Sequence, residues 1–525
     1  MKKDISTEHV VEVFLREGTV AETARQMDIA RASVQYHLKK AGIKKPVAAG
    51  LKSGLKAQTV PLPPEGTVKR YIFSSAQNNT FVNKEALLSL QTLASHYNAE
   101  IHIARFAYNL QGFQPAKPEV IGDEMWYDPA IAPYISDGRL QIAPNLVWCG
   151  EMNILPTAAR PLSDLETYTG TKSGIFPHVK IAMESVANNK WEATKFNYTT
   201  GTVTKLNYIQ KKAGLKAEFH HCFGGLLVEV DSLGRWFARQ LNADSKGRIY
   251  DLDILADGES LTTGHRVEAI NWGDIHEQEL SPAIKKLCWG KDGLLDYLRP
   301  KYQFMHDLVS FTRRNHHDRK NPHKMFAIHC AGRDAVEGEM DDVAKFLVED
   351  AARDFSEIVV VDSNHDNALT KWLREADYRE DPPNALFFLK CQSRKYQAIA
   401  DEDSWFHMVE WVLQDKGVPK EVRFLREDEH FLICNDEIEC GMHGHLGPNG
   451  ARGTPWNLAK IGRKANTGHT HSAGIRDGLY TAGTCSVMDM GYNSGPGSWS
   501  HSHIITYANG KRCINTMWHG AYRAT

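Results

Sequence analysis

Side chains able to bind cations recur in short motifs through the second half of the chain. The motifs are WGDIH, FMHDL, SNHD, GMHGH and TGHTH. In D-x-H and H-x-H the two donors lie on one face of an extended segment, as chelation of a single cation requires. The strand-end donors that we expect to gather in one site are Asp274, His276, Asp307, Asn364, His365, His443, His445, His469 and His471.

The chemistry of this set indicates which cations it would bind. Carboxylate, amide and imidazole donors favour Mn²⁺, Fe or Zn²⁺ over Ca²⁺ or Mg²⁺ alone. The set contains no thiolate, which argues against a structural zinc site. Its size predicts a pair of divalent metal ions, Mn²⁺ first, with Fe, Zn²⁺ or Mg²⁺ as alternatives.

One of these motifs lies in the stretch EIVVVDSNHDNALTKWL, residues 357–373. Four apolar residues are followed by a polar turn and then by apolar residues at helical spacing. This pattern predicts a buried strand, a tight turn and a helix. Taken alone, the turn fits a simple helix cap equally well. A lone Asn-His-Asp or His-x-His is also more often a surface feature, so the site hypothesis rests on all five motifs together.

The elements that must position these motifs alternate between strand and helix from residue 263 to the end. Polar residues recur where the predicted strands end, and α/β folds place their ligand-binding groups at such strand ends. We therefore predict an α/β fold for residues 263–525. Seventeen of the 24 histidines follow residue 262, which also points to this region for chemistry.

The order D-x-H, D, N-H-D, H and G-H-x-H resembles the signature of the calcineurin-like metallophosphoesterases, and it spans residues 263–525. MHGHLGPNG is similar to the H-G-H segment of that family, and GLYTAGTCS resembles the strand and turn that follow G-H-x-H. Two departures are Ser363 and the pair Met305-His306, which stand where the family has glycine. The resemblance implies a β-sandwich flanked by helices.

The resemblance also implies a role for each side chain. One metal would take Asp274, His276 and His471, the second would take Asn364, His443 and His469, and Asp307 would bridge them. His365 would bind no metal and would instead stabilise developing charge or protonate the leaving oxygen, with Asp366 orienting its ring. His445 would be an outer-shell group.

The first 45 residues differ in kind from the rest. GTVAETARQMDIARASVQYHLKKAGI resembles a helix-turn-helix, with 20–27 as the supporting helix and 31–40 as the recognition helix. Asp28 stands where glycine is most common in the turn. Residues 1–60 hold eight Lys and three Arg against six acids, which suits phosphate contacts. A protein-interaction domain with a solvated basic face is the alternative. The expected DNA-binding residues are Arg31, Ser33, Gln35, Tyr36, Lys39 and Lys40.

Two further regions follow. Residues 46–66 are rich in Gly, Pro and Lys and predict a flexible linker. Residues 67–262 predict an α/β accessory domain of unassigned role that begins with a strand, a helix at 84–97 and a second strand.

Bulk properties exclude several classes of protein. The net charge of −2 over 525 residues shows that any affinity for nucleic acid must come from local patches. The nine cysteines include no Cys-x-x-Cys pair, which favours free thiols in a reducing compartment. No apolar run reaches the roughly 18 residues of a membrane span, and MKKDISTEHVVEVF lacks the apolar core of a secretory signal. We expect a cytoplasmic protein with no membrane partner, in the host cytoplasm if phage-encoded, and leave a homo-oligomer open.

These observations favour a metal-dependent DNA nuclease. A two-metal site hydrolyses phosphoesters, and a DNA-binding module on a flexible linker would raise the concentration of that site on DNA. The basic loop TRRNHHDRK adds cationic groups after Asp307. The layout also resembles phage-encoded metallophosphoesterases of the early DNA-degrading nuclease type. Two alternatives stay open: a small-molecule phosphatase or cyclic-nucleotide phosphodiesterase, and a DNA-binding regulator whose metal domain is only structural.

Overall fold

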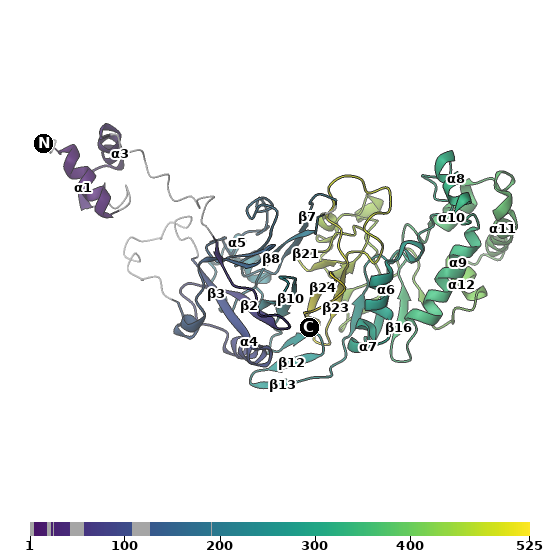
Figure 1. The fold of residues 1–525 in the computed structure, drawn as a ribbon, viewed down its shortest axis with the longest axis horizontal. Coiled ribbons are helices and arrows are strands. Elements are labelled where there is room, and N and C mark those ends of the chain that lie inside the picture. The colour runs from purple at the N-terminus through teal and green to yellow at the C-terminus, as the bar shows by residue number, and fades with distance from the viewer. Residues whose placement is uncertain are drawn as a thin grey trace. The chain divides into compact units, whose positions relative to one another are not determined.

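The protein is a mixed α/β chain with several sheets (Figure 1). The computed structural model describes residues 5–17, 23–24, 26–41, 57–107, 127–190 and 192–524. The chain divides into two compact units, Met1–Lys56 (unit 1) and Ala57–Thr525 (unit 2). Residues 46–56 of the predicted linker lie outside the described residues.

Unit 1 contains the helices α1 (Thr7–Glu17) and α3 (Arg31–Lys40). Val10 and Phe14 of α1 pack against Val34 and Leu38 of α3 in a small buried core. The supporting helix predicted at 20–27 lies partly outside the described residues. Asp28 adopts φ 51°, the left-handed conformation that glycine favours, so this turn keeps the backbone geometry that a glycine there would supply.

After the short strand β1 (Gln58–Thr59), unit 2 contains the β-α-β arrangement that the sequence predicts. Strand β2 (Val68–Gln77) and strand β3 (Ala99–Phe106) pair in parallel, and helix α4 (Lys84–Tyr97) connects them. The Asn83 side chain caps α4 by accepting a hydrogen bond from the Ala86 backbone. Antiparallel strands β9 (Gly224–Asp231) and β10 (Trp236–Asn242) complete a four-stranded sheet.

A six-stranded sheet carries three of the predicted motifs. Its order is β17-β16-β15-β14-β23-β24, with β14 to β17 parallel. Alternate residues of β16 enter different cores: Ile358 and Val360 face helices, whereas Val359 faces the neighbouring sheet. Both faces are therefore buried, which explains the continuous apolar run in this strand. The strands are β14 (Ala269–Asn271), β15 (Tyr302–Met305), β16 (Glu357–Val360), β17 (Arg423–Phe424), β23 (Ser502–Thr506) and β24 (Arg512–Thr516).

An eleven-stranded sheet carries the other two motifs and joins both halves of unit 2. Its order is β1-β4-β5-β6-β8-β7-β21-β22-β20-β19-β18. The junction is the pairing of Ile475 in β21 with Met183 in β7. The boundary predicted at residue 262 therefore falls between segments that share one sheet, because strand patterns identify strands but not their partners. The strands are β1 (Gln58–Thr59), β4 (Arg139–Ala143), β5 (Leu146–Cys149), β6 (Ser173–Phe176), β7 (Met183–Val186), β8 (Lys195–Thr199), β18 (Leu432–Ile433), β19 (Ile438–Glu439), β20 (Lys464–Thr467), β21 (Gly474–Arg476) and β22 (Leu479–Thr481).

These two sheets pack against each other, and helices cover the outer face of the six-stranded sheet. Phe304 and Val359 meet Ile438 and Cys440 in the core between the sheets.

The remaining strands form a small sheet of β11 (Ile249–Asp251), β12 (Ile254–Asp257) and β13 (Ser260–Thr262). The other α-helices are α5 (Lys212–Phe219), α6 (Pro282–Trp289), α7 (Leu294–Leu298), α8 (Pro322–Cys330), α9 (Val336–Lys345), α10 (Ala368–Glu375), α11 (Ala385–Ala400), α12 (Met408–Asp415) and α13 (Pro455–Leu458). Among the described residues, no helix combines the length and apolar character needed to cross a bilayer.

Candidate metal centre

The five motifs lie directly after strands of the two packed sheets. Asp274, Asp307 and Asn364 follow the parallel strands β14, β15 and β16. His443 and His469 follow the parallel strands β19 and β20 of the other sheet. Carboxyl ends of parallel neighbours meet at one edge, which brings groups far apart in sequence into one place.

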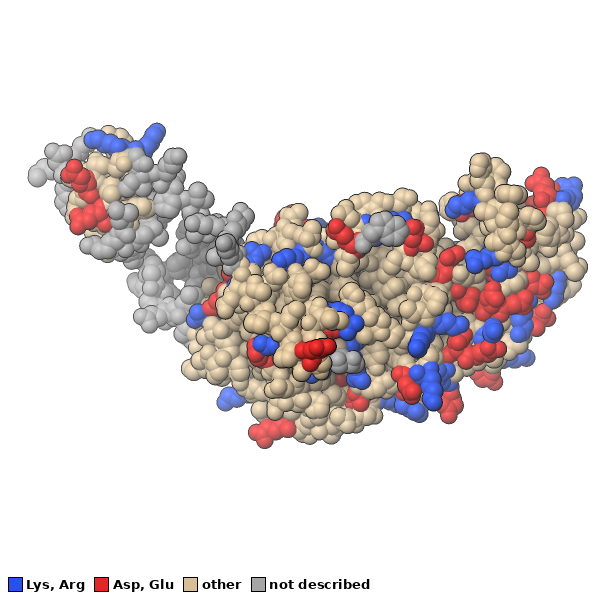
Figure 2. Space-filling view, in the orientation of Figure 1, with Lys and Arg blue, Asp and Glu red and all other residues tan. Residues whose placement is uncertain are grey.

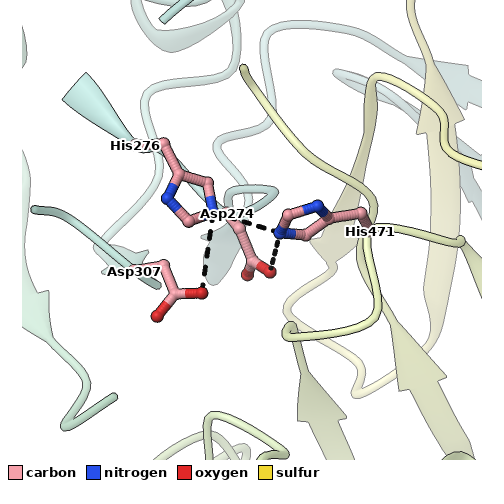
Figure 3. A group of neighbouring side chains, drawn as sticks. All are labelled: Asp274, His276, Asp307 and His471. Carbon is pink, nitrogen blue, oxygen red and sulfur yellow. Dashed lines mark hydrogen bonds and ion pairs between the residues drawn. The ribbon is translucent and has the colours of Figure 1, made fainter. Parts of the chain in front are cut away.

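The first group of candidate ligands is Asp274, His276, Asp307 and His471. All four are buried, and each offers an atom within 4.8 Å of the others. Their side chains point toward one another (Figure 3). His471 Nε2 lies 3.0 Å from Asp274 Oδ2 and 3.1 Å from His276 Nε2, which in turn is 3.6 Å from Asp307 Oδ2.

The second group is Asp307, His443 and His469. His443 Nε2 lies 3.3 Å from Asp307 Oδ2, so the Asp307 carboxylate belongs to both groups, as the predicted bridging ligand would. Asn364 is exposed and lines the same cavity as Asp307 and His469. The structure thus gathers six of the seven predicted ligands into two clusters and places the seventh beside them.

Two buried ring nitrogens in the cluster lack hydrogen-bond partners in the part of the chain that the structure describes, as expected of side chains that bind a cation. Nδ1 of His276 and Nδ1 of His471 are buried without a hydrogen-bond partner among the described residues. The ring nitrogens of His443 face carboxylate oxygens of Asp307 and Asp274 at 3.3 and 3.9 Å. Burying polar nitrogens without partners is costly, and a bound cation would offset that cost. These buried Asp and His side chains could hold a metal ion.

Electrostatics couple the two groups. Burial lowers the pKa of His443, but the carboxylates of Asp307 and Asp274 outweigh burial and raise it to about 9. Burial raises the pKa of Asp274, yet His443 and His471 reverse that effect and bring it to about 2. Burial and the charge of His443 lower the pKa of His469 to about 4. Protonated His443 therefore acts as the counter-ion of two carboxylates in the metal-free protein.

Strained backbone holds four of the candidate ligands. His276, Asp307, His469 and His471 have φ values of 47°, 44°, 73° and 56°, in the left-handed region that non-glycine residues rarely adopt. Such strain persists only where surrounding structure imposes it, and it clusters at functional sites. Gly468 sits among them, and a Cβ atom there would lie 2.2 Å from Asp274 Oδ1.

His365 lies beside the first group, and Ser310 orients its ring. Nδ1 of His365 lies 3.0 Å from the Ser310 carbonyl, and its backbone N–H donates to Asp307 Oδ1 at 3.3 Å. The His365 and His276 ring centroids are 4.6 Å apart. With Nδ1 held by the carbonyl, Nε2 is the nitrogen left for chemistry.

Asp366 has a different role from the predicted one. Its carboxylate accepts hydrogen bonds from the Val309 backbone N–H at 2.8 Å and the Ser363 hydroxyl at 2.8 Å. It therefore ties the turn after β16 to the turn after β15 and does not orient the ring of His365. Burial and the neighbouring Asp307 raise the pKa of Asp366 to about 6.

Two further histidines border the cluster. His445, the predicted outer-shell group, has its ring centroid 5.4 Å from that of His443. His306 was not predicted to belong to the site, yet it is fully buried with its ring 5.6 Å from His443 and neither nitrogen hydrogen-bonded among the described residues. In the sequence, the position of His306 between the strand β15 and the candidate ligand Asp307 was the feature that could have identified it.

A cavity of about 790 Å³ opens beside the cluster. The basic loop TRRNHHDRK reaches it through His316 and His317, whereas Arg313 and Arg314 are ion-paired with Asp342 and Asp381. The lining also includes Asp307, Asn364, His365, Arg452, His469, His471, Tyr492 and Trp499.

Comparison with known proteins places the chain in a family. Protein A1 of Escherichia phage T5 is 42% identical over 469 residues, which cover 87% of this chain and 83% of the relative. The chain belongs to the family of this phage protein. No family model and no solved structure matches it. Because the aligned length exceeds that of residues 263–525, the A1 similarity extends into the region before residue 263.

The predicted DNA-contacting residues of this A1-family chain lie on α3. Gln35, Tyr36, Lys39 and Lys40 are exposed, and Ser33 is half-buried. The side chain of Arg31 lies outside the described residues. The apolar side of α3 faces the core, so its polar side is available for a partner.

Proposed function

We propose that this A1-family protein is a metal-dependent DNA nuclease of the calcineurin-like metallophosphoesterase type. The observation that carries the proposal is the carboxylate of Asp307, shared by two clusters of candidate cation ligands that are buried except for the half-buried His469. A bridging carboxylate is what a two-metal site for phosphoryl chemistry needs. Mn²⁺ is the first choice for both positions.

The ligands divide as the resemblance implies. Asp274, His276 and His471 would hold one cation; Asn364, His443 and His469 would hold the other. When bound, two divalent cations would supply Lewis-acid charge that activates a water molecule and neutralises the phosphate. Protonation of the leaving oxygen would fall to His365, whose Nε2 is positioned by the hydrogen bond between Nδ1 and the Ser310 carbonyl.

The reaction is hydrolysis of one P–O bond. The oxygen of water forms a new bond to phosphorus while the bond to the leaving alcohol oxygen breaks. Protonated His365 donates its Nε2 proton to that leaving oxygen, and the proton released by water returns to His365 through solvent. The products are a phosphate monoester and an alcohol, with no change in oxidation state.

The surroundings of the cavity favour a polymer. Pro455 and Thr470 line both the 790 Å³ cavity and a neighbouring one of about 470 Å³. In the second cavity the Arg476 guanidinium lies over the Trp456 ring, and the Arg160 guanidinium lies over the same ring. Arg476 is ion-paired with Glu184 of the same lining, whereas the exposed Arg160 has no ion pair with any described residue and could meet the phosphates of a strand leaving the metal centre.

Unit 1 would provide the tether to DNA. On the face of unit 2 drawn in Figure 2, Lys and Arg are interspersed with Asp and Glu over the helical part rather than forming one positive surface. Lys39 and Lys40 of α3 are exposed, and the run of Lys after them adds charge in the sequence. Such groups supply the non-specific part of DNA affinity.

A small-molecule phosphoesterase is the second candidate. A cavity of about 790 Å³ is within the usual size range of small-ligand sites. A regulator with a purely structural metal is less well supported, because the cluster borders an open cavity and includes the strained backbone typical of functional sites.

Digestion of DNA tests the proposal. Purified protein with Mn²⁺ should degrade linear or circular DNA, and EDTA should stop the reaction. Comparison of the two DNA forms reports whether an end is required. Intact DNA beside rapid hydrolysis of a nucleotide monoester or cyclic nucleotide would refute the nuclease and support the second candidate.

A further inference from the structure

Two aromatic side chains stand at the wall of the 790 Å³ cavity. Tyr492 and Trp499 belong to the loop between β22 and β23, in the sequence MDMGYNSGPGSWS. The Trp499 ring lies edge-on to His471, with centroids 4.2 Å apart, and 5.9 Å from the ring of Tyr492. Tyr492 is 56% exposed, so its ring is not part of a core.

The loop that carries these rings is fixed at several points. The Ser500 backbone N–H donates to the carbonyl of the candidate ligand His471 at 3.0 Å. The Ser498 and Ser472 hydroxyls are 2.7 Å apart. The Asn493 side chain closes the tip by donating to the Met488 carbonyl at 2.9 Å. The rings are thus positioned by a tied backbone, as a binding platform needs.

A cation faces the same cavity. Arg452 is exposed and has no ion pair with any described residue, in contrast to Arg313 and Arg314. The lining thus combines an aromatic surface, a free guanidinium and the candidate metal ligands. A nucleotide offers the matching groups: a base with π faces, flanking phosphates and a scissile phosphodiester.

We propose that Trp499 and Tyr492 stack an unpaired nucleobase next to the scissile phosphate, with Arg452 contacting a flanking phosphate. This inference rests on the proposed phosphodiesterase function and names its substrate class as a single-stranded or frayed nucleic acid. Bases within a duplex are already stacked on their neighbours and offer no free face to a protein ring. The site therefore selects strands whose bases are splayed out.

Binding without turnover tests the stacking site. A fluorescent thymidine oligomer of roughly six nucleotides is titrated in EDTA beside a tetrahydrofuran (abasic) oligomer of the same length and charge. Trp499→Leu should weaken binding of the thymidine oligomer by about 5- to 150-fold and leave binding of the abasic oligomer unchanged. Trp499→Phe should keep most of the affinity. Trp405→Leu, which changes an exposed Trp elsewhere, is the matched control.

The outcomes separate this inference from the proposed function. Equal loss on both oligomers, or no loss on either, would overturn the stacking site. Base-dependent binding that needs Trp499 in a protein that cleaves no DNA would refute the nuclease alone. If Trp499→Leu fails to fold, Tyr492→Leu carries the test, because this ring is mostly exposed. Unchanged preference for bases in that variant would then reject the proposal.

Discussion

The Oδ2 atom of Asp307 lies 3.3 Å from Nε2 of His443, where the two groups of candidate ligands meet. The same oxygen is 3.6 Å from Nε2 of His276, so one atom borders both clusters. We expect Asp307→Asn to lose both cations together, because a neutral amide cannot balance two divalent charges. Metal content by elemental analysis should fall, and hydrolysis should drop by more than about 100-fold.

Asp415→Asn is the matched control for this change, since Asp415 forms an exposed ion pair with Lys390 away from the cavity. It should keep metal and activity. Full metal content in Asp307→Asn would remove the residue from the shared position.

Gly468 offers a steric test of the same cluster. A methyl group at this position would lie 2.2 Å from Asp274 Oδ1, so Gly468→Ala should displace that carboxylate. We expect Mn²⁺ affinity to fall by about 10- to 100-fold in isothermal titration. Gly138→Ala, where a Cβ atom meets nothing within 4 Å, should bind as the parent does. Equal affinities would show that Asp274 is not a ligand.

The candidate ligands were visible in the sequence because each follows a strand and repeats at a spacing that one face can use. The D-x-H pattern identifies Asp274 and His276 as candidates, and the H-x-H pattern identifies His469 and His471. The sequence pattern also predicted the strand, turn and helix around Asn364, and the structure contains them as β16, the turn and α10. Local patterns determine these features.

Contacts between residues far apart in the sequence determine the features that the sequence did not predict. Met183 and Ile475 are neighbours in one sheet although almost three hundred positions separate them, and neither residue signals the other. Ser310 binds the ring of His365 through a backbone carbonyl, which any residue type could supply. Trp499 lies in a Gly- and Ser-rich loop whose place beside His471 depends on a backbone hydrogen bond.

The proton held by His443 should stabilise the metal-free protein, and this contribution should be lost as pH rises through the pKa of His443. Two carboxylates raise this pKa to about 9, above the value of about 6.5 expected in the unfolded chain. The native state thus holds a proton that the unfolded state releases, so stabilisation is complete below pH 6.5 and disappears by about pH 9. Across this window the free energy of unfolding in EDTA should fall by about 3 kcal/mol more in the parent protein than in a His443→Gln variant.

His443→Gln should lack this contribution in denaturant titrations. Stability curves of parent and variant that run parallel between pH 6.5 and 9 would contradict the proposed proton. Mn²⁺ must displace the same proton, so its affinity should rise over the same range.

His365 should affect chemistry and not metal binding. His365→Ala should keep its metal content yet hydrolyse DNA about 100- to 10,000-fold more slowly, because the leaving alkoxide loses its proton donor. The leaving group of bis(4-nitrophenyl) phosphate is a stable phenolate that needs no proton donor. Hydrolysis of this substrate by His365→Ala should therefore slow much less than hydrolysis of DNA. Equal losses on both substrates would assign His365 to charge stabilisation instead of proton transfer.

Removal of unit 1 should separate binding from hydrolysis. The truncated chain should begin at Ala57, because β1 (Gln58–Thr59) pairs with β4 of unit 2 and belongs to its sheet. We expect DNA affinity in filter binding to fall by about 100-fold while hydrolysis of the small diester is unchanged. Replacing Lys39 and Lys40 with Ala in the full chain should lower the salt dependence of binding by about two charges. Unchanged DNA affinity in the truncated chain would show that α3 does not hold DNA, and slower diester hydrolysis would show that unit 1 supports the metal centre.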